Sequence, residues 1–103
     1  MARTAYRRKK HFVEDMAVST RHMENGDEIG LTPRRRAIVR GLNQRATARQ
    51  RQVLYLYYGR GLNMETIGKL LNIDISTVSR TVKRGEAHAR RAMDLVQEKA
   101  PSE

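Results

Sequence analysis

Two short apolar runs joined by a polar turn, between Gly61 and Gly85, constrain the fold of this chain most. Before the turn, apolar residues fall at helical spacing and give a short helix one buried stripe: Met64, Ile67, Leu70 and Leu71. Asn63 can cap the start of this helix, and Asn72 tolerates the left-handed conformation that ends it. Because Asp74 can cap a second helix, the segment predicts a helix-turn-helix.

The second helix of this motif divides into a packing side and a polar side. Val78 and Val82 serve packing, and Gly68, which costs roughly 1 kcal/mol against alanine in mid-helix, predicts that the second helix crosses close to the first. The polar side carries groups suited to base edges, with the Arg80 guanidinium matching guanine best. We predict that the DNA bases are read by Ser76, Ser79, Arg80 and Lys83. Thr77 is expected to cap the helix or to bind a phosphate, and Arg84 to pair with a phosphate or with a surface acid such as Glu86, rather than to read a base.

A longer pattern surrounds this motif and extends from Thr47 to Ala92. Its members are Arg49 and Arg51 before Val53 and Leu54, then Tyr57, Gly61-Leu62, Glu65, Ile67, Leu71, Ile73, Thr77-Val78 and Arg84. Together they resemble region four of the sigma seventy family of sigma factors. The DNA-binding domain of quorum-response regulators shares much of the pattern. The resemblance implies a binding module whose second helix enters the major groove of double-stranded DNA.

The sequence upstream of the motif lacks the length and aromatic content of the sigma domain that opens a promoter, so we do not expect a complete sigma factor. The resemblance implies a free-standing, sigma-like transcriptional regulator of the kind encoded by bacteria, prophages and mobile elements. It would recognise a specific DNA sequence with helix 75–84, in the cytoplasm of a bacterial or phage-infected cell. The resemblance leaves a contact with RNA polymerase open.

Positive charge is concentrated in the N-terminal half of the chain. The 103 residues have a formal net charge of +10, and residues 1–51 hold 13 of the 21 lysines and arginines but only 5 of the 11 acids. Basic tracts of this kind bind phosphate. We predict phosphate contacts at Arg7, Arg8, Lys9, Lys10, Arg34, Arg35, Arg49 and Arg51. About six neutralised phosphates would give a slope of log affinity against log salt of about −5.

The remaining signals predict an all-α protein, a small bundle of four to five helices with a basic N-terminal tail. Residues 1–11 have little to bury and are expected to be flexible. An N-terminal helical segment follows over residues 12–45. The sigma-like domain covers residues 46–97, and residues 98–103 form a C-terminal tail.

Capping residues place two helix starts before the motif. Thr32 supplies a capping hydroxyl and Pro33 a proline at the first position of a helix that should end near Asn43. Thr47 and Gln50 form a capping box that opens the next helix. Both starts are local signals that do not depend on the resemblance.

Three tyrosines, at positions 55, 57 and 58, end the helix that the capping box opens. We expect Tyr57 in the core, because aromatic residues that stack on single-stranded bases usually have no core role. The phenol of Tyr55 or Tyr58 could instead donate a hydrogen bond to a phosphate from the helix surface.

Small and apolar residues continue past the reading segment in alternating steps of four and three. They are Val78, Val82, Gly85, Ala89, Ala92 or Met93, and Val96. Such a stripe is either an intramolecular core or the seam of a two-helix dimer. Quorum-response relatives dimerise through their last helix, so the resemblance favours a homodimer on two half-sites about one DNA turn apart.

The sequence offers no catalytic or metal-binding constellation. His11, His22 and His88 have no nucleophile or second ligand at a useful spacing, and the acids are dispersed. There is no cysteine, and the longest apolar run, Val53 to Tyr58, has six residues, far fewer than a membrane span needs. We therefore expect a protein that is not an enzyme, has no cofactor and does not bind a membrane.

Two other classes of protein could carry the same fold. A phage small-terminase-like component would present DNA to a packaging motor and would form a large ring in solution. A helical adaptor would bind RNA or an RNA-protein particle, and would prefer structured RNA to duplex DNA. A monomer or dimer with a defined duplex site would exclude both.

Overall fold

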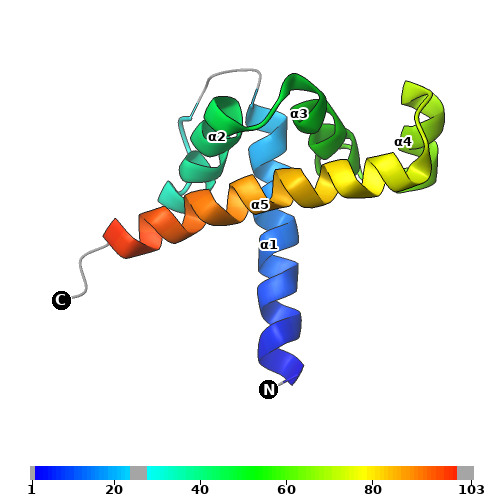
Figure 1. The fold of residues 1–103 in the computed structure, drawn as a ribbon. Coiled ribbons are helices and arrows are strands. Elements are labelled where there is room, and N and C mark those ends of the chain that lie inside the picture. Colours follow the sequence, from blue (N-terminus) through cyan, green and yellow to red (C-terminus); the bar gives the residue numbers. More distant parts are fainter. Residues whose placement is uncertain (1, 24–27, 100–103) are drawn as a thin grey trace.

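The described residues of the computed structural model, 2–23 and 28–99, fold into five α-helices and one π-helical turn. The elements are α1 (Ala2–His22), α2 (Pro33–Arg45), α3 (Ala48–Leu54), η1 (Tyr55–Gly59), α4 (Met64–Leu71) and α5 (Ile75–Lys99). The predicted all-α bundle is confirmed. Figure 1 shows α5 spanning the molecule, with α1 crossing behind it.

The long helix α5 is the element on which the motif and the N-terminal segment meet. It packs against α2, α3 and α4, whereas α1 packs mainly against η1 and α2. Two glycines permit the close approach to α5. A Cβ on Gly41 would lie 2.6 Å from Ala92 Cβ, and one on Gly85 would lie 2.5 Å from Leu54 Cδ1. Residues 12–45 and 46–97 therefore share one hydrophobic core.

The stripe of small and apolar residues along α5 belongs to this intramolecular core. Val78, Val82 and Ala89 are buried, as are Ala92 and Met93. Because α2 and α3 already cover this face of α5, it cannot serve as a dimer seam in this fold. A homodimer would need another surface.

Local capping signals are confirmed at both predicted starts. Thr32 Oγ1 accepts a hydrogen bond from Arg35 N at 3.2 Å, and Thr47 and Gln50 form the reciprocal capping box. The helix that begins at Pro33 ends at Arg45, two residues later than expected, because the Ala46 N–H still donates to Leu42 O. The helix opened by the capping box widens into η1 after Leu54.

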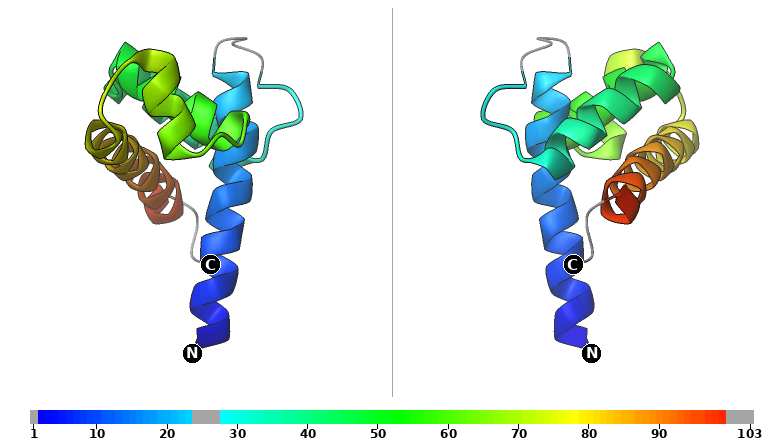
Figure 2. Two further views of the ribbon diagram at one scale, coloured as in Figure 1. Left: turned by 90° about the vertical axis from the view of Figure 1, so that its right-hand side faces the viewer. Right: turned by 90° about the vertical axis from the view of Figure 1, so that its left-hand side faces the viewer.

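The N-terminal residues differ from the expectation of a flexible tail. Residues 2–11 form the first half of α1, which projects from the body of the molecule in Figures 1 and 2. This segment has no glycine or proline, and its alanine, arginine and lysine residues favour helix. The helix continues directly into Phe12 and Met16, whose burial anchors it. The expected breaker at 24–27 and residues 100–103 lie outside the described residues, and α5 includes 98–99.

Candidate nucleic-acid interface

The turn between α4 and α5 has the geometry that the sequence predicted. Asn63 caps α4 by accepting from Thr66 N at 2.8 Å, and Asn72 ends it with φ 57° and ψ 48°, in the left-handed region. Gly68 is needed for a different reason from the expected one. A Cβ there would lie 2.8 Å from the Ile73 carbonyl oxygen, so the turn itself, rather than a crossing by α5, comes closest.

Packing of α4 departs from the predicted stripe at one position. Ile67 is fully buried, and Met64 and Leu71 are half-buried against the core. Leu70 is 62 % exposed. A short helix at the surface buries only one side, and Leu70 lies about 100° around the helix from Leu71.

The first turn of α5 is fixed by Asp74. Its carboxylate accepts a hydrogen bond from the Ser76 hydroxyl and another from the Ser76 backbone N–H, the latter at 3.0 Å. These two bonds, with a smaller contribution from the positive charge of Arg80, lower the pKa of Asp74 below its ordinary value. Asp74 is therefore ionised at neutral pH, and the Ser76 hydroxyl keeps its lone pairs for an outside donor.

The predicted reading residues lie on the side of α5 that faces away from the core. Ser76, Arg80 and Lys83 are exposed, and Ser79 is half-buried at the edge of this face. Arg80 Nη2 lies 3.4 Å from Thr77 Oγ1, to which it donates. Buried Val78 and Val82 occupy the opposite side of the helix. The structure thus brings three of the four predicted readers onto one open surface.

Two neighbours of the reading face also have defined positions. Ile75 is 52 % exposed, so it does not close the core beside the turn, a role that half-buried Ile73 fills. Thr77 is half-buried and Arg84 is exposed. An exposed apolar side chain at the start of α5 can contact a thymine methyl group.

The tyrosines of η1 contribute more to core packing than expected. Tyr57 and Tyr58 pack against the core, with their rings 4.9 Å apart in an edge arrangement. The Tyr58 hydroxyl donates a hydrogen bond to the Glu86 carboxylate. Burial, followed by this bond to the charged Glu86, raises the pKa of Tyr58 above its ordinary value. Because the Tyr58 hydroxyl donates to Glu86, it is not free to donate to a phosphate. Tyr55 lies at the surface.

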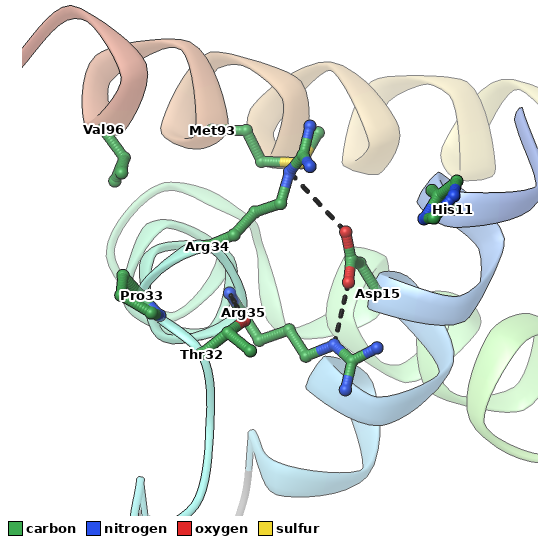
Figure 3. Close-up of a pocket in the computed structure, with 8 residues that line it drawn as sticks. All are labelled: His11, Asp15, Thr32, Pro33, Arg34, Arg35, Met93 and Val96. Atoms are coloured by element: carbon green, nitrogen blue, oxygen red, sulfur yellow. Dashed lines mark hydrogen bonds and ion pairs between the residues drawn. The ribbon is translucent and has the colours of Figure 1, made fainter. Parts of the chain in front are cut away.

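The predicted phosphate-binding arginines of α2 already have a carboxylate partner. Figure 3 shows Arg34 and Arg35 on either side of Asp15 from α1, with Nε–carboxylate distances of 3.6 Å and 2.8 Å. The Asp15 residue is only 8 % exposed. These two arginines therefore anchor α2 to α1 and are partly neutralised.

The other predicted phosphate contacts are dispersed. Arg51 donates from Nη1 to the Ala46 carbonyl oxygen at 2.7 Å and so caps the end of α2. Arg49 and Lys10 are exposed. The side chains of Arg7, Arg8 and Lys9, which are also predicted to contact phosphates, lie outside the described part of the structure.

The structure separates the arginines of α2 from the reading face. The cavity beside Arg34 and Arg35 is lined by Met93 and Val96, near the end of α5. At 1.5 Å per helical residue, Met93 lies about 20 Å along α5 from Arg80. Arg34 and Arg35 therefore lie far from the reading face at the start of α5.

The exposed face of α5 also includes basic residues that the sequence argument left unassigned. Arg90 and Arg91 are exposed. Arg90 follows Lys83 by seven residues and Arg91 follows Arg84 by seven, about two turns, so each returns to the side of the residue that it follows. The signal for them in the sequence is the seven-residue spacing from Lys83 and Arg84, which lies on the same helix as the more prominent apolar stripe.

Two further features bear on other classes of function. Among residues 2–23 and 28–99, no three histidine or acidic side chains gather in a way that could hold a metal ion. Within the same ranges, no helix is both long and apolar enough to cross a membrane.

Comparison with known proteins identifies the part of the chain that contains this surface. Residues 44–91 match the family model of sigma-70, region 4, a helix-turn-helix DNA-binding domain. The match covers α3, η1, α4 and most of α5, just under half of the chain. Searches of the curated proteins and of the solved structures gave no match.

Proposed function

We propose that this chain, with its sigma-70 region 4 segment, is a sigma-like transcriptional regulator that recognises a specific double-stranded DNA sequence through the N-terminal part of α5. The observation that carries the proposal is the uncovered polar face of this helix. Ser76, Arg80 and Lys83 lie exposed there, opposite a row of buried valines. A major groove about 12 Å wide admits a helix presented in this way.

The proposed roles follow from the chemistry of each side chain. The Arg80 guanidinium can donate two hydrogen bonds to O6 and N7 of guanine, and Lys83 can donate to the same acceptors. Ser76, whose hydroxyl proton is committed to Asp74, is suited to accept from adenine N6 or cytosine N4. Ser79 is placed at the edge of the contact. Specificity thus rests on Arg80 first.

Phosphate contacts are proposed around this helix. Arg84 is exposed one turn after Arg80, and Thr77 lies beside the reading face. Arg49 is exposed in the first turn of α3, which packs against α5. The ionised Asp74 disfavours a phosphate at the N-terminus of α5, so base edges rather than the backbone should face that end.

Selection of bound duplexes from a random pool, with the molecular mass measured in the same buffer, tests this function. We expect enrichment of one short duplex motif by a monomer or dimer. Arg36→Ala, a change of an exposed arginine on α2, should enrich the same motif. Binding without enrichment, a ring-sized mass, or a preference for structured RNA over the selected duplex would each contradict the proposal.

A further inference from the structure

The exposed face of α5 does not end with the reading residues. Beyond Lys83, the residues at Arg84, Ala87, Arg90 and Arg91 are also exposed. Arg84, Ala87 and Arg91 recur at steps of three and four and so continue the same side of the helix, whereas Arg90 lies at the flank of this side, about 100° around the helix from Arg91. In Figure 1, α5 runs along the front of the molecule, with α1 crossing behind it.

This continuation has a net positive charge, because between Ser76 and Leu95 the helix α5 carries five lysines and arginines but only two acids, Glu86 and Asp94. Between Asp74 and Asp94, the single acidic residue of α5 is Glu86. Its carboxylate accepts the hydrogen bond from Tyr58 at the half-buried flank of the helix. Arg84, Arg90 and Arg91 therefore add to the field of Arg80 and Lys83 before Asp94 ends the basic stretch.

One of these arginines is held in place. The guanidinium carbon of Arg90 lies 4.3 Å from the centre of the Phe12 ring, in a cation–π contact. Stacking occupies the face of a guanidinium and leaves N–H groups on its edge to donate. Next to it, a shallow depression of about 430 Å³ is lined by Ala87, Arg90, Arg91, Asp94 and Leu95. The small side chain of Ala87 leaves room for a ligand beside the two arginines.

The length of the helix relates this depression to the proposed groove contact. Ser76 and Arg91 are 15 residues apart, so they are separated by about 23 Å along α5. The major groove is only about 12 Å wide. A straight helix whose first turns lie across the groove therefore carries its later turns past the groove edge, where the sugar-phosphate backbone lies.

We propose that Ala87, Arg90 and Arg91 form a second DNA contact that binds phosphates flanking the site read by the start of α5. This inference rests on the proposed function. This second contact adds affinity but does not discriminate between DNA sequences, because phosphates are the same at every site.

Removal of the Arg91 charge tests the proposal. In Arg91→Ala, the slope of log affinity against log salt should become shallower by about 0.9, the value for one lost phosphate contact. The selected duplex and a random duplex should lose affinity by the same factor. Arg36→Ala removes the same charge from the surface of α2 and should leave the slope unchanged.

A second pair of variants tests the depression itself. Ala87→Glu places a carboxylate where we expect a phosphate, and should weaken binding to both duplexes at least about tenfold. Ala87→Gln adds nearly the same bulk without charge and should retain most of the affinity. Thermal melting followed by circular dichroism identifies variants that remain folded.

The outcomes separate this contact from the proposed function. If Arg91→Ala keeps the wild-type slope and Ala87→Glu binds like Ala87→Gln, the second contact is refuted while sequence-specific reading by Arg80 stands. If the wild-type protein selects no duplex motif at all, the proposed function fails, and this inference fails with it.

Discussion

The basic residues of α2 and those of α5 look alike in the sequence but differ in what surrounds them. On α2, Arg34 and Arg35 meet Asp15, and Arg40 forms a two-pronged ion pair with Glu28 at 2.9 Å and 3.1 Å. On α5, Arg80, Lys83, Arg84 and Arg91 lie on an exposed face, where Glu86 accepts a hydrogen bond from Tyr58 and Asp94 follows the last arginine.

The comparison shows that the number of basic residues in a tract is a poor guide to its free charge. The acids that pair with the α2 arginines are 12 to 20 positions away in the sequence, on α1 or the loop before α2. They become neighbours only when the helices pack. We therefore expect the paired arginines of α2, Arg34, Arg35 and Arg40, to support the fold and those of α5 to bind DNA.

The largest expected effect is on stability, from removing Asp15. Asp15→Asn leaves Arg34 and Arg35 facing each other without a carboxylate, and should lower the free energy of unfolding by about 2 kcal/mol. The loss is smaller than for a fully buried ion pair because both arginines are partly exposed. Urea unfolding measures the loss. Glu14→Gln, the same change of charge at an exposed neighbour, should cost little. Equal losses in the two variants would contradict the anchoring role of Asp15.

Arg80→Ala should produce the next largest change, in DNA affinity. We expect it to cost about 1 to 3 kcal/mol on the selected duplex and much less on random DNA, because a base contact is lost. Fluorescence anisotropy with both duplexes measures this difference. An equal loss on both would reassign Arg80 to a phosphate.

Tyr58→Phe should destabilise the fold by about 1 kcal/mol at neutral pH, because it removes the hydrogen bond to Glu86. Folding raises the pKa of Tyr58, so this contribution is complete below the unfolded pKa of about 10 and is lost as the pH rises toward the folded pKa. Unfolding measured from pH 8 to pH 11 should show a smaller alkaline decline in Tyr58→Phe than in the wild type. Parallel curves would show that this bond does not control the alkaline decline.

The smallest effect should come from Arg34→Ala, measured as the salt dependence of DNA binding. Arg34 is paired with Asp15 and lies beside Met93 and Val96, at the opposite end of α5 from Arg80. Its loss should therefore leave the slope nearly unchanged. Arg84→Ala should make the slope shallower by about 0.9. If Arg34→Ala changes the slope as much as Arg84→Ala does, the contrast between the two regions fails.

The parts of the fold that the sequence predicts well depend on local chemistry. The caps at Thr32, Thr47 and Asn63 and the left-handed Asn72 each involve residues within four positions of one another, and all are observed. The spacing of the valines also predicts which side of α5 is buried.

Properties that arise from long-range packing could not be predicted from the same signals. Leu70 and Leu71 have the same hydrophobicity, yet Leu70 is exposed while Leu71 packs against the core, and this difference depends on how α4 packs against α5 and η1. The spacing of the stripe along α5 is compatible with either a core or a dimer seam, and the packing of α2 against α5 makes it a core. Likewise, the roles of Arg34 and Arg35 depended on Asp15, which a different helix supplies.

Mapping the bound duplex onto the protein tests the central claim most directly. We would titrate the selected duplex into ¹⁵N-labelled protein and follow the backbone amide and arginine side-chain resonances. We expect the largest changes from Asp74 to Arg91, centred on Arg80, with little change from Pro33 to Arg45. Changes concentrated on α2, with α5 unaffected, would contradict it.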